Sequence, residues 1–368
     1  MACLPCALGW LTMALAPSLP VLLAGRVSCG ISGLLAVPNC SLLVAQYSHS
    51  SHRGAFLSMF GLCVQLGVLL CYSLGAGLYW RWVALIPCLL YLLNFLLLLR
   101  VPESPLWLLG HRPHQAREAL QWFRQTEDVT GELGELQLTM ENQSQALTAG
   151  QALRNLARPD IWKPFLLIIT NILFAQFSGP YIIVFYAVEI FQSSGVRLNN
   201  HLAAMLIASI AVLGGFVSIF LIQKFPRVRL NMAMMTVMAA ALTTMGLTVY
   251  LKTDYPGQSS VLDILQVLAV TAVMFGYGAG PGPLIWVYLA ELLPREYKVL
   301  SGIIVASANI PVFIMTKIFP SLLSLLSPPG TYWLLASVAA SSNIFYAFLM
   351  PETKGKSPLE VKQIFKKN

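Results

Sequence analysis

Charged residues are scarce in this 368-residue sequence. Asp, Glu, Lys and Arg together make up 10% of the residues, whereas hydrophobic residues make up 57% and the mean hydropathy is +0.70. A soluble globule of this length carries more surface charge, so a soluble protein is excluded. Alternating segments of about ten residues, which are typical of membrane β-barrels, are also missing. The composition therefore predicts an all-α membrane protein that crosses the bilayer several times.

The residue patterns of catalytic and metal sites are missing as well. No serine–histidine–acid set, zinc-ligand spacing or phosphate-binding loop is recognisable. The histidines fall in polar turns or at the end of an apolar stretch (His49, His52, His111, His114 and His201). No carboxylate is evident in the interior of the apolar stretches before Glu291, so proton coupling has no obvious carrier. We therefore expect no enzyme, no cofactor and no metal, and a passive, facilitated movement of solute.

All seven cysteines lie in apolar stretches of the first quarter of the chain (Cys3, Cys6, Cys29, Cys40, Cys63, Cys71 and Cys88). Cys3 and Cys6 have no histidine or second cysteine pair nearby that would complete a zinc site, so we interpret the seven as small packing residues. The first ten residues lack a charged region and no small-residue cleavage site follows, so no signal peptide is predicted.

About 20 apolar residues are needed for a helix to cross the ~30 Å hydrocarbon core. Ten stretches qualify or nearly qualify, at about 1–16, 19–46, 55–78, 82–100, 164–190, 200–222, 230–251, 262–290, 299–322 and 332–350. The one long polar region, 101–162, has Ala116, Leu120 and Phe123 at near-helical spacing. We predict an incomplete N-terminal bundle at 1–100, a linker with short amphipathic helices at 101–162, a C-terminal six-helix bundle at 163–350 and a tail at 351–368.

Most of the 23 basic residues fall in loops on one side of the predicted spans, which argues against nucleic acid as the reason for the net charge of +8. They are Arg53, Arg100, Arg112, Arg117, Arg124, Arg154, Arg158, Lys163, Lys224, Arg227, Arg229, Arg295, Lys298, Lys354, Lys356, Lys362, Lys366 and Lys367. Basic loops face the cytoplasm. We predict a multi-pass protein of the plasma membrane with the linker and both termini in the cytoplasm.

The stretch 276–294, GYGAGPGPLIWVYLAELLP, is apolar but interrupted by helix breakers (Gly278, Gly280, Pro281, Gly282 and Pro283). Proline has no amide proton, so a helix through these residues leaves carbonyl groups without partners. Lipid tolerates such groups only where they face protein or a water-filled cavity. The stretch therefore predicts a solute path at mid-membrane, and the alternative is a kinked helix that serves packing alone.

A weak internal repeat links the two halves of the chain. Gln46 is followed seven residues later by Arg53, and Glu291 is followed seven residues later by Lys298, in each case at the end of an apolar stretch. Two spans later the halves end in the similar words PESP (102–105) and PETK (351–354). Parallel duplication of a helical bundle is known among transporters. The first copy has two spans fewer before its motif, so we expect that two N-terminal helices are lacking.

These motifs are similar to those of the sugar-porter branch of the major facilitator superfamily, including glucose transporters and insect trehalose transporters. The likeness covers nearly the whole chain. It is carried by Gly25-Arg26, Arg53-Gly54, Pro102-Glu103-Ser104-Pro105, Gln176 with Ser178-Gly179, Gly280-Pro281-Gly282-Pro283 with Trp286, Glu291, and residues 351–357, PETKGKS. The resemblance implies two helical bundles, with about ten of the family's twelve spans present.

The resemblance also implies a substrate site in which amide side chains bind sugar hydroxyls and an indole packs on the ring. The matching residues are Gln176, Trp286, Asn309 and Tyr181, the last in place of an asparagine, with Phe185 and Tyr186 as an aromatic pair that closes over the sugar. Gly61, Ala175 and Ile310 depart from the pattern, and Gln65 lies one turn after Gly61. The alternative is that these amides and aromatic residues only satisfy packing within the bundle.

A cytoplasmic gate is implied by Arg53, Glu103, Arg227, Glu291 and Lys298, which match residues that pair across the two bundles in similar transporters. The breaker residues Gly280–Pro283 are the expected hinge. Three gate partners are altered, at Gln46, Leu106 and Val228, so we predict a weaker inner latch and a bias toward inward-facing states. The alternative is that these charges are merely solvated at helix ends.

The first hypothesis is a facilitative carrier that moves a hexose or a trehalose-like disaccharide by alternating access. Its partners are the sugar and the lipid bilayer. The second hypothesis is a truncated, non-transporting regulatory or sensor-like membrane protein of the same family, since the loss of two helices would open the wall of the N-terminal bundle.

Overall fold

The computed structural model describes residues 3–47, 53–143, 159–193, 199–254, 259–293, 298–356 and 358–366. Every regular element within these ranges is a helix, as the composition predicts. The chain forms two compact units. Unit 1 comprises residues 1–47, 79–157 and 294–302, and unit 2 comprises residues 48–78, 158–293 and 303–368.

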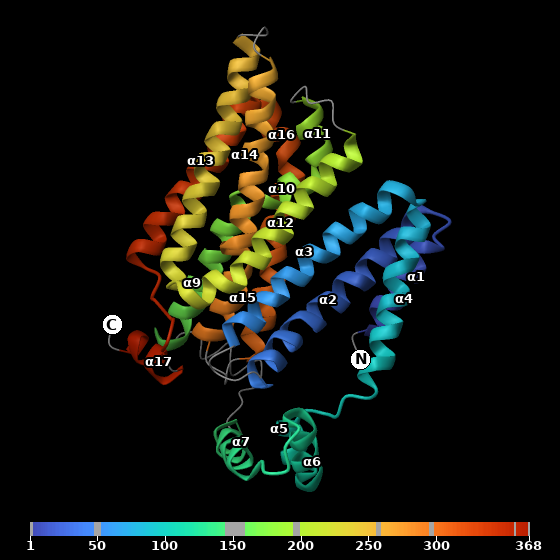
Figure 1. Ribbon diagram of the computed structural model, residues 1–368, viewed down its shortest axis with the longest axis vertical. Helices are drawn as coiled ribbons and strands as arrows, with labels where there is room; N and C mark the ends of the chain where they lie inside the picture. Colours follow the sequence, from blue (N-terminus) through green and yellow to red (C-terminus); the bar gives the residue numbers. More distant parts are fainter. Residues whose placement is uncertain are drawn as a thin grey trace. The chain divides into compact units, whose positions relative to one another are not determined.

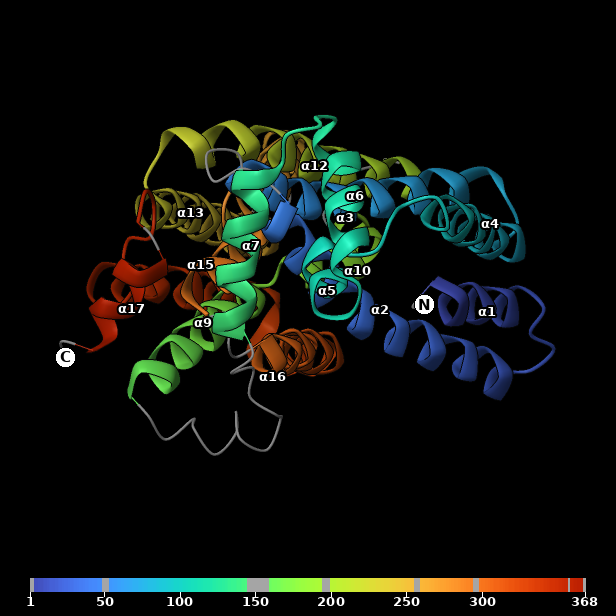
Figure 2. The same ribbon diagram turned by 90° about the horizontal axis from the view of Figure 1, so that it is seen from below.

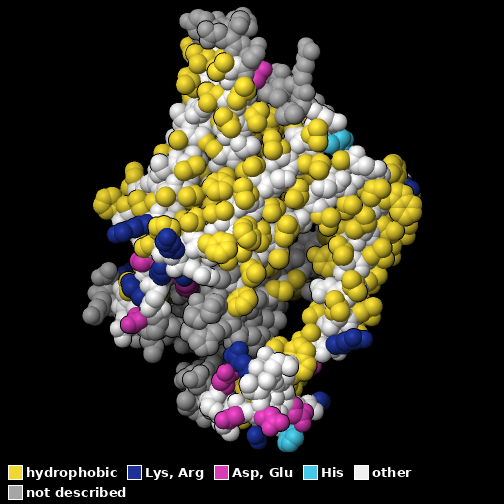
Figure 3. All heavy atoms as spheres, viewed as in Figure 1, with side chains coloured by type: hydrophobic (Ala, Val, Ile, Leu, Met, Phe, Trp, Pro, Cys, Tyr) yellow, Lys and Arg dark blue, Asp and Glu magenta, His cyan; other side chains and the backbone are white. Residues whose placement is uncertain are grey.

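Unit 1 contains the helices α1 (Cys3–Ala14), α2 (Leu19–Tyr47) and α4 (Trp80–Leu98), with α1 packed against both of the others. A side chain at Gly9 or Gly25 would meet the backbone of the other residue at 2.8–2.9 Å, so only glycine permits this close crossing of α1 and α2. The linker forms three short helices, α5 (Pro105–His111), α6 (Pro113–Arg124) and α7 (Thr130–Gln143). In Figure 3, many of the charged side chains on the visible face gather over these short helices.

Unit 2 contains α3 (Arg53–Gly77), α9 (Pro159–Phe177), α10 (Pro180–Phe185), α11 (Ala187–Ser193), α12 (Asn200–Lys224), α13 (Arg227–Asp254), α14 (Ser259–Ala279), α15 (Pro281–Leu292), most of α16 (Lys298–Phe348) and α17 (Pro358–Lys366). Helices α12 and α13 both run alongside α14 (Figure 1). The C-terminal helix α17 lies beside α9 and α15 (Figure 2). Helix α3, which we expected in the N-terminal bundle, packs here against α12 and α15.

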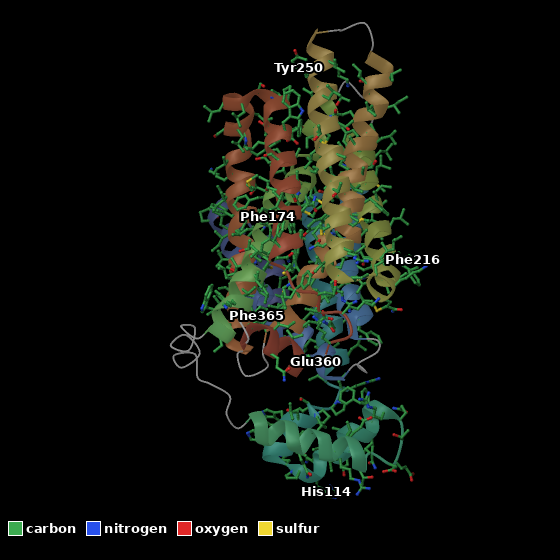
Figure 4. The ribbon with its side chains drawn as sticks, turned by 90° about the vertical axis from the view of Figure 1, so that its left-hand side faces the viewer. His114, Phe174, Phe216, Tyr250, Glu360 and Phe365 are labelled. Carbon is green, nitrogen blue, oxygen red and sulfur yellow. The ribbon has the colours of Figure 1, made fainter. Side chains whose placement is uncertain are left out.

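Eight helices among the described residues are long and apolar enough to cross a membrane, and α1 is shorter, so the expected number of ten spans is not confirmed. Two of the expected spans merge into α16, which is interrupted at Ser327 by a backbone with φ 60° and ψ 162°. Pro328 follows this residue and disfavours the helical conformation there. Many large apolar side chains of the long helices are exposed; Phe216, for example, points away from α12. His114, by contrast, lies on the polar linker helix α6 (Figure 4).

Two expected spans are broken, and these breaks shape unit 2. The stretch 276–294 divides into α14 and α15 at Gly280-Pro281, as the breaker residues predict. The stretch 164–190, which we expected to be one helix, divides into α9, α10 and α11. Gly179 has a φ of +87°, a left-handed conformation that glycine adopts without strain, and Pro180 then begins α10. Polar side chains next to these two breaks are therefore candidates for a site.

Candidate functional site

A cavity of about 630 Å³, partly open to solvent, lies within unit 2. Its polar lining consists of Gln65, Gln176, Tyr181, Tyr277 and Trp286. Its apolar lining includes residues of α3, α9, α15 and α16, for example Val64, Ile172, Leu289 and Val305. Sites for small molecules typically combine apolar walls with a few polar groups in this way. No charged side chain lines the cavity among the described residues, so its chemistry suits a neutral ligand.

The break between α9 and α10 positions two of the polar side chains. Gln176 lies in the last turn of α9 and Tyr181 in the first turn of α10. The Gly179 amide donates to the Gln176 carbonyl at 3.2 Å, and the Ser178 hydroxyl donates to the Ala175 carbonyl at 2.9 Å. These bonds cap the end of α9, and the Gln176 side chain is 7% exposed.

The second break and α3 position the indole and the other amide. Trp286 lies in α15, where the ring of Phe60 packs edge-on against it with centroids 4.9 Å apart. A β-carbon at Gly61 would be in van der Waals contact with Pro283 at 3.4 Å, so α3 lies directly against α15 at this position. Gln65 follows one turn later and lines the cavity.

Three of the expected binding residues are not brought to the cavity. The exposed Asn309 donates its amide to the Val305 carbonyl at 3.1 Å, within its own helix. Phe185 is 63% exposed. Tyr186 donates its hydroxyl to the Thr316 carbonyl at 2.9 Å. These three side chains are therefore not among the residues that line the cavity with Gln176 in the described part of the chain, and their role in binding stays a prediction.

Sequence reasoning missed Tyr277. This tyrosine lies one turn before Pro281, on α14, and lines the cavity at a ring-centroid distance of 6.1 Å from Tyr181. Residues four positions apart lie on the same face of a helix. The spacing of Tyr277 from Pro281 is therefore the signal in the sequence that would have identified this tyrosine.

A second polar cluster joins two of the five expected gate residues in unit 2. The Arg227 and Glu291 side chains form an ion pair at 3.3 Å, and Glu291 also accepts the Thr353 hydroxyl. Glu352 accepts the backbone amides of Arg227 and Val228 at 2.9 and 3.1 Å. A carboxylate suits these free amides at the start of α13.

The remaining gate residues do not test the expected pairing across two bundles. The side chains of Arg53 and Lys298 lie outside the described residues. Glu103 is exposed and belongs to unit 1. The cross-bundle latch and its predicted weakness therefore stay predictions.

Comparison with known proteins agrees with this architecture. The family described as "Sugar (and other) transporter" matches residues 1–365. The facilitated trehalose transporter Tret1 of Apis mellifera ligustica is 28% identical over 370 residues, which cover 98% of this chain and 72% of the relative. The mouse solute carrier family 2, facilitated glucose transporter member 8, is 30% identical over 375 residues, which cover 96% of this chain and 76% of the relative.

Solved structures show the same fold. The proton:xylose symporter XylE bound to 6-bromo-6-deoxy-D-glucose superposes with a TM-score of 0.79 at 20% identity, over 99% of this chain and 82% of XylE. The inward open conformation of XylE from E. coli gives 0.74, over 99% of this chain and 81% of XylE. The chain is therefore a multi-pass membrane protein of the sugar porter family within the major facilitator superfamily, a family of transporters rather than enzymes.

Proposed function

We propose that this chain is a facilitative carrier that moves a hexose or a trehalose-like disaccharide across the membrane by alternating access. The single observation that carries the proposal is the cavity where amides, phenols and an indole meet beside two broken helices. Amide side chains offer donors and acceptors together, which a polyol requires on losing its water. An indole packs on the apolar C–H face of a sugar ring.

The lining supports passive transport of a neutral solute. Proton coupling requires a titratable group that meets the substrate or the gate during transport, and no carboxylate lines the cavity among the described residues. The movement proposed is a rocking of two bundles, with the breaks at Gly179 and Gly280–Pro283 as points where the backbone bends. We propose the plasma membrane as the location, with both termini in the cytoplasm.

The test is counterflow of radiolabelled D-glucose and trehalose in proteoliposomes that contain the purified protein. We expect uptake against preloaded unlabelled sugar that is unchanged when an ionophore removes the pH gradient. Gln176→Leu removes a hydrogen-bonding side chain worth ~0.5–1.5 kcal/mol and should lower the apparent affinity about two- to tenfold. Sugar binding without counterflow would contradict the carrier and favour the non-transporting regulatory or sensor-like protein.

A further inference from the structure

Two segments at one end of unit 2 lie against each other and carry several basic side chains. The first joins α12 to α13 (residues 224–229), and the second follows α16 (residues 349–356). The Lys354 side chain donates to the Lys224 carbonyl at 2.8 Å. The basic side chains that reach the surface of these two segments, here called the basic face, are Lys224, Arg229, Lys354 and Lys356.

The carboxylates next to the basic face are engaged in other interactions. Glu291 pairs with the largely buried Arg227. Glu352 accepts three backbone amides, those of Arg227, Val228 and Lys354, at 2.9–3.1 Å. The two segments together with Glu291 contain five basic and two acidic side chains, so their net charge is +3 at pH 7. Within the described part of the chain, no member of the basic face forms an ion pair.

The opposite end of α13 shows a lysine in the contrasting situation. There Lys252 pairs with Asp263 of α14 at 2.5 Å, and both side chains are largely buried. A positive charge that is neutralised in this way attracts an external anion only weakly. The basic face keeps its charge at the surface, where an anionic ligand can meet it.

Exposed aromatic side chains mark the level at which the basic face lies. Phe225 is 43% exposed, and the Lys224 ammonium lies 6.0 Å from the centre of its ring. Trp162 is 41% exposed in the first turn of α9, the helix against which α17 packs. Aromatic side chains at the ends of membrane-spanning helices lie at the level of the lipid headgroups. Because α12 ends and α13 begins at the same place, the basic face lies at the level of lipid phosphates.

We propose that the basic face binds the headgroup of an anionic phospholipid in the leaflet that surrounds this end of unit 2. Basic side chains beside a membrane-spanning helix attract anionic lipid, and each strengthens the binding about fivefold. The guanidinium of Arg229 matches two phosphate oxygens at once, whereas the lysine ammonium groups act as mobile point charges. The first two amides of α13 take no part, because Glu352 accepts both of them. This inference goes beyond the proposed function and does not depend on transport.

A bound headgroup connects the two segments. Lys224 and Arg229 belong to the first segment and Lys356 to the second, so a phosphate between them attracts both. The unfolded chain does not bring these side chains together, so lipid binding favours the folded state. We therefore expect anionic lipid to raise the unfolding temperature of the protein.

The test measures which lipid the purified protein retains. The protein is captured on an affinity resin from mixed micelles with equal amounts of phosphatidylserine and phosphatidylcholine, and the retained lipids are extracted and quantified. We expect phosphatidylserine in about tenfold excess or more. Raising the salt concentration from about 50 mM to about 500 mM should lower this preference about threefold or more, because ions screen exposed charges.

The triple substitution Lys224→Gln, Arg229→Gln and Lys356→Gln removes the exposed charges of the basic face. We expect the preference for phosphatidylserine to fall about tenfold, to near parity. The rise in unfolding temperature that phosphatidylserine produces should disappear as well. The substitution Lys224→Arg with Lys356→Arg retains both charges and should keep the preference.

The matched control is the triple substitution Arg112→Gln, Arg117→Gln and Lys317→Gln, which removes three exposed charges elsewhere and should leave the preference unchanged. The readout is the ratio of two lipids in one sample, so a change in the yield of folded protein cancels out. A basic-face triple variant that keeps the preference would overturn the proposal, and so would equal retention of the two lipids by the unmodified protein. A control that loses the preference to the same extent would show that net charge alone decides, which also overturns it. Sugar transport does not enter the readout, so failure of the carrier proposal leaves this result unchanged.

Discussion

The ion pair between Arg227 and Glu291 allows a quantitative test of the polar cluster at the start of α13. The Arg227 side chain is 9% exposed and the Glu291 side chain 21% exposed, with 3.3 Å between their charged atoms. The other guanidinium nitrogen of Arg227 donates to the Ile222 carbonyl at 2.7 Å. Its Nε atom has no hydrogen-bond partner among the residues that the structure describes. Glu291 is therefore the group that compensates a largely buried positive charge.

Glu291→Gln preserves the shape of the side chain but removes its charge. Breaking a buried ion pair from one side typically costs ~3–5 kcal/mol, because the remaining charge stays buried without compensation. The partial exposure of Glu291 places the expected loss at the lower end, about 3 kcal/mol in the free energy of unfolding. The double substitution Arg227→Met with Glu291→Leu removes both charges, so we expect it to cost only about 1 kcal/mol.

The assay is equilibrium unfolding of the purified protein in mixed micelles, followed by tryptophan fluorescence. It compares Glu291→Gln, the single variants Arg227→Met and Glu291→Leu, and the double variant that combines these two. We expect an interaction free energy of about 2 kcal/mol or more between the two positions. Glu132→Gln is the control, because its 2.7 Å pair with Arg124 on the linker is much more exposed and should change stability by less than about 1 kcal/mol. A double variant as unstable as Glu291→Gln alone would refute the reasoning.

Two further substitutions test the packing of unit 2. Gly278→Ala adds a methyl group 2.5 Å from the Ala211 carbonyl, so α12 and α14 must separate. We expect about 1–3 kcal/mol of destabilisation in the same unfolding assay. Gly67→Ala is the control, because its methyl group meets open space and should leave stability unchanged or raise it. Tyr72→Phe removes the 2.7 Å hydrogen bond to the Val184 carbonyl and should lower the free energy of unfolding by about 1 kcal/mol. Because this bond holds α10 against α3, we also expect faster maleimide labelling of a cysteine introduced at Val184. Unchanged labelling would show that the bond does not restrain α10.

The location of the long apolar helices along the chain could be predicted from hydropathy, because lipid requires long apolar stretches whichever helices they pack against. The break at Gly280-Pro281 could also be predicted, since two prolines and neighbouring glycines remove backbone hydrogen bonds locally. The break at Gly179 was not predicted. A single glycine within an apolar stretch is compatible with a continuous helix, and its left-handed conformation depends on the packing of α10 in unit 2.

The side chains of the candidate site illustrate the same limit. Two residues that the resemblance implies for the site, Gln176 of α9 and Trp286 of α15, line the cavity. Asn309 does not line it: it lies one turn after the lining residue Val305, but its amide donates to the Val305 carbonyl at 3.1 Å within α16. Which face of α16 points inward is decided by the residues that pack against it, and a linear pattern of mostly apolar residues contains little of that information.

The positions of the polar side chains that line the cavity follow from the broken helices themselves. Both Gln176 and Tyr277 lie within one turn of a break, three residues before Gly179 and four residues before Pro281. Each break leaves backbone groups without their usual partners, and these groups require a polar environment within the membrane. Polar side chains are tolerated beside such groups and would be costly against lipid. The same breaks that open space for a solute therefore also fix where hydroxyl-binding side chains can be placed, which is why the cavity gathers its amides and phenols between them.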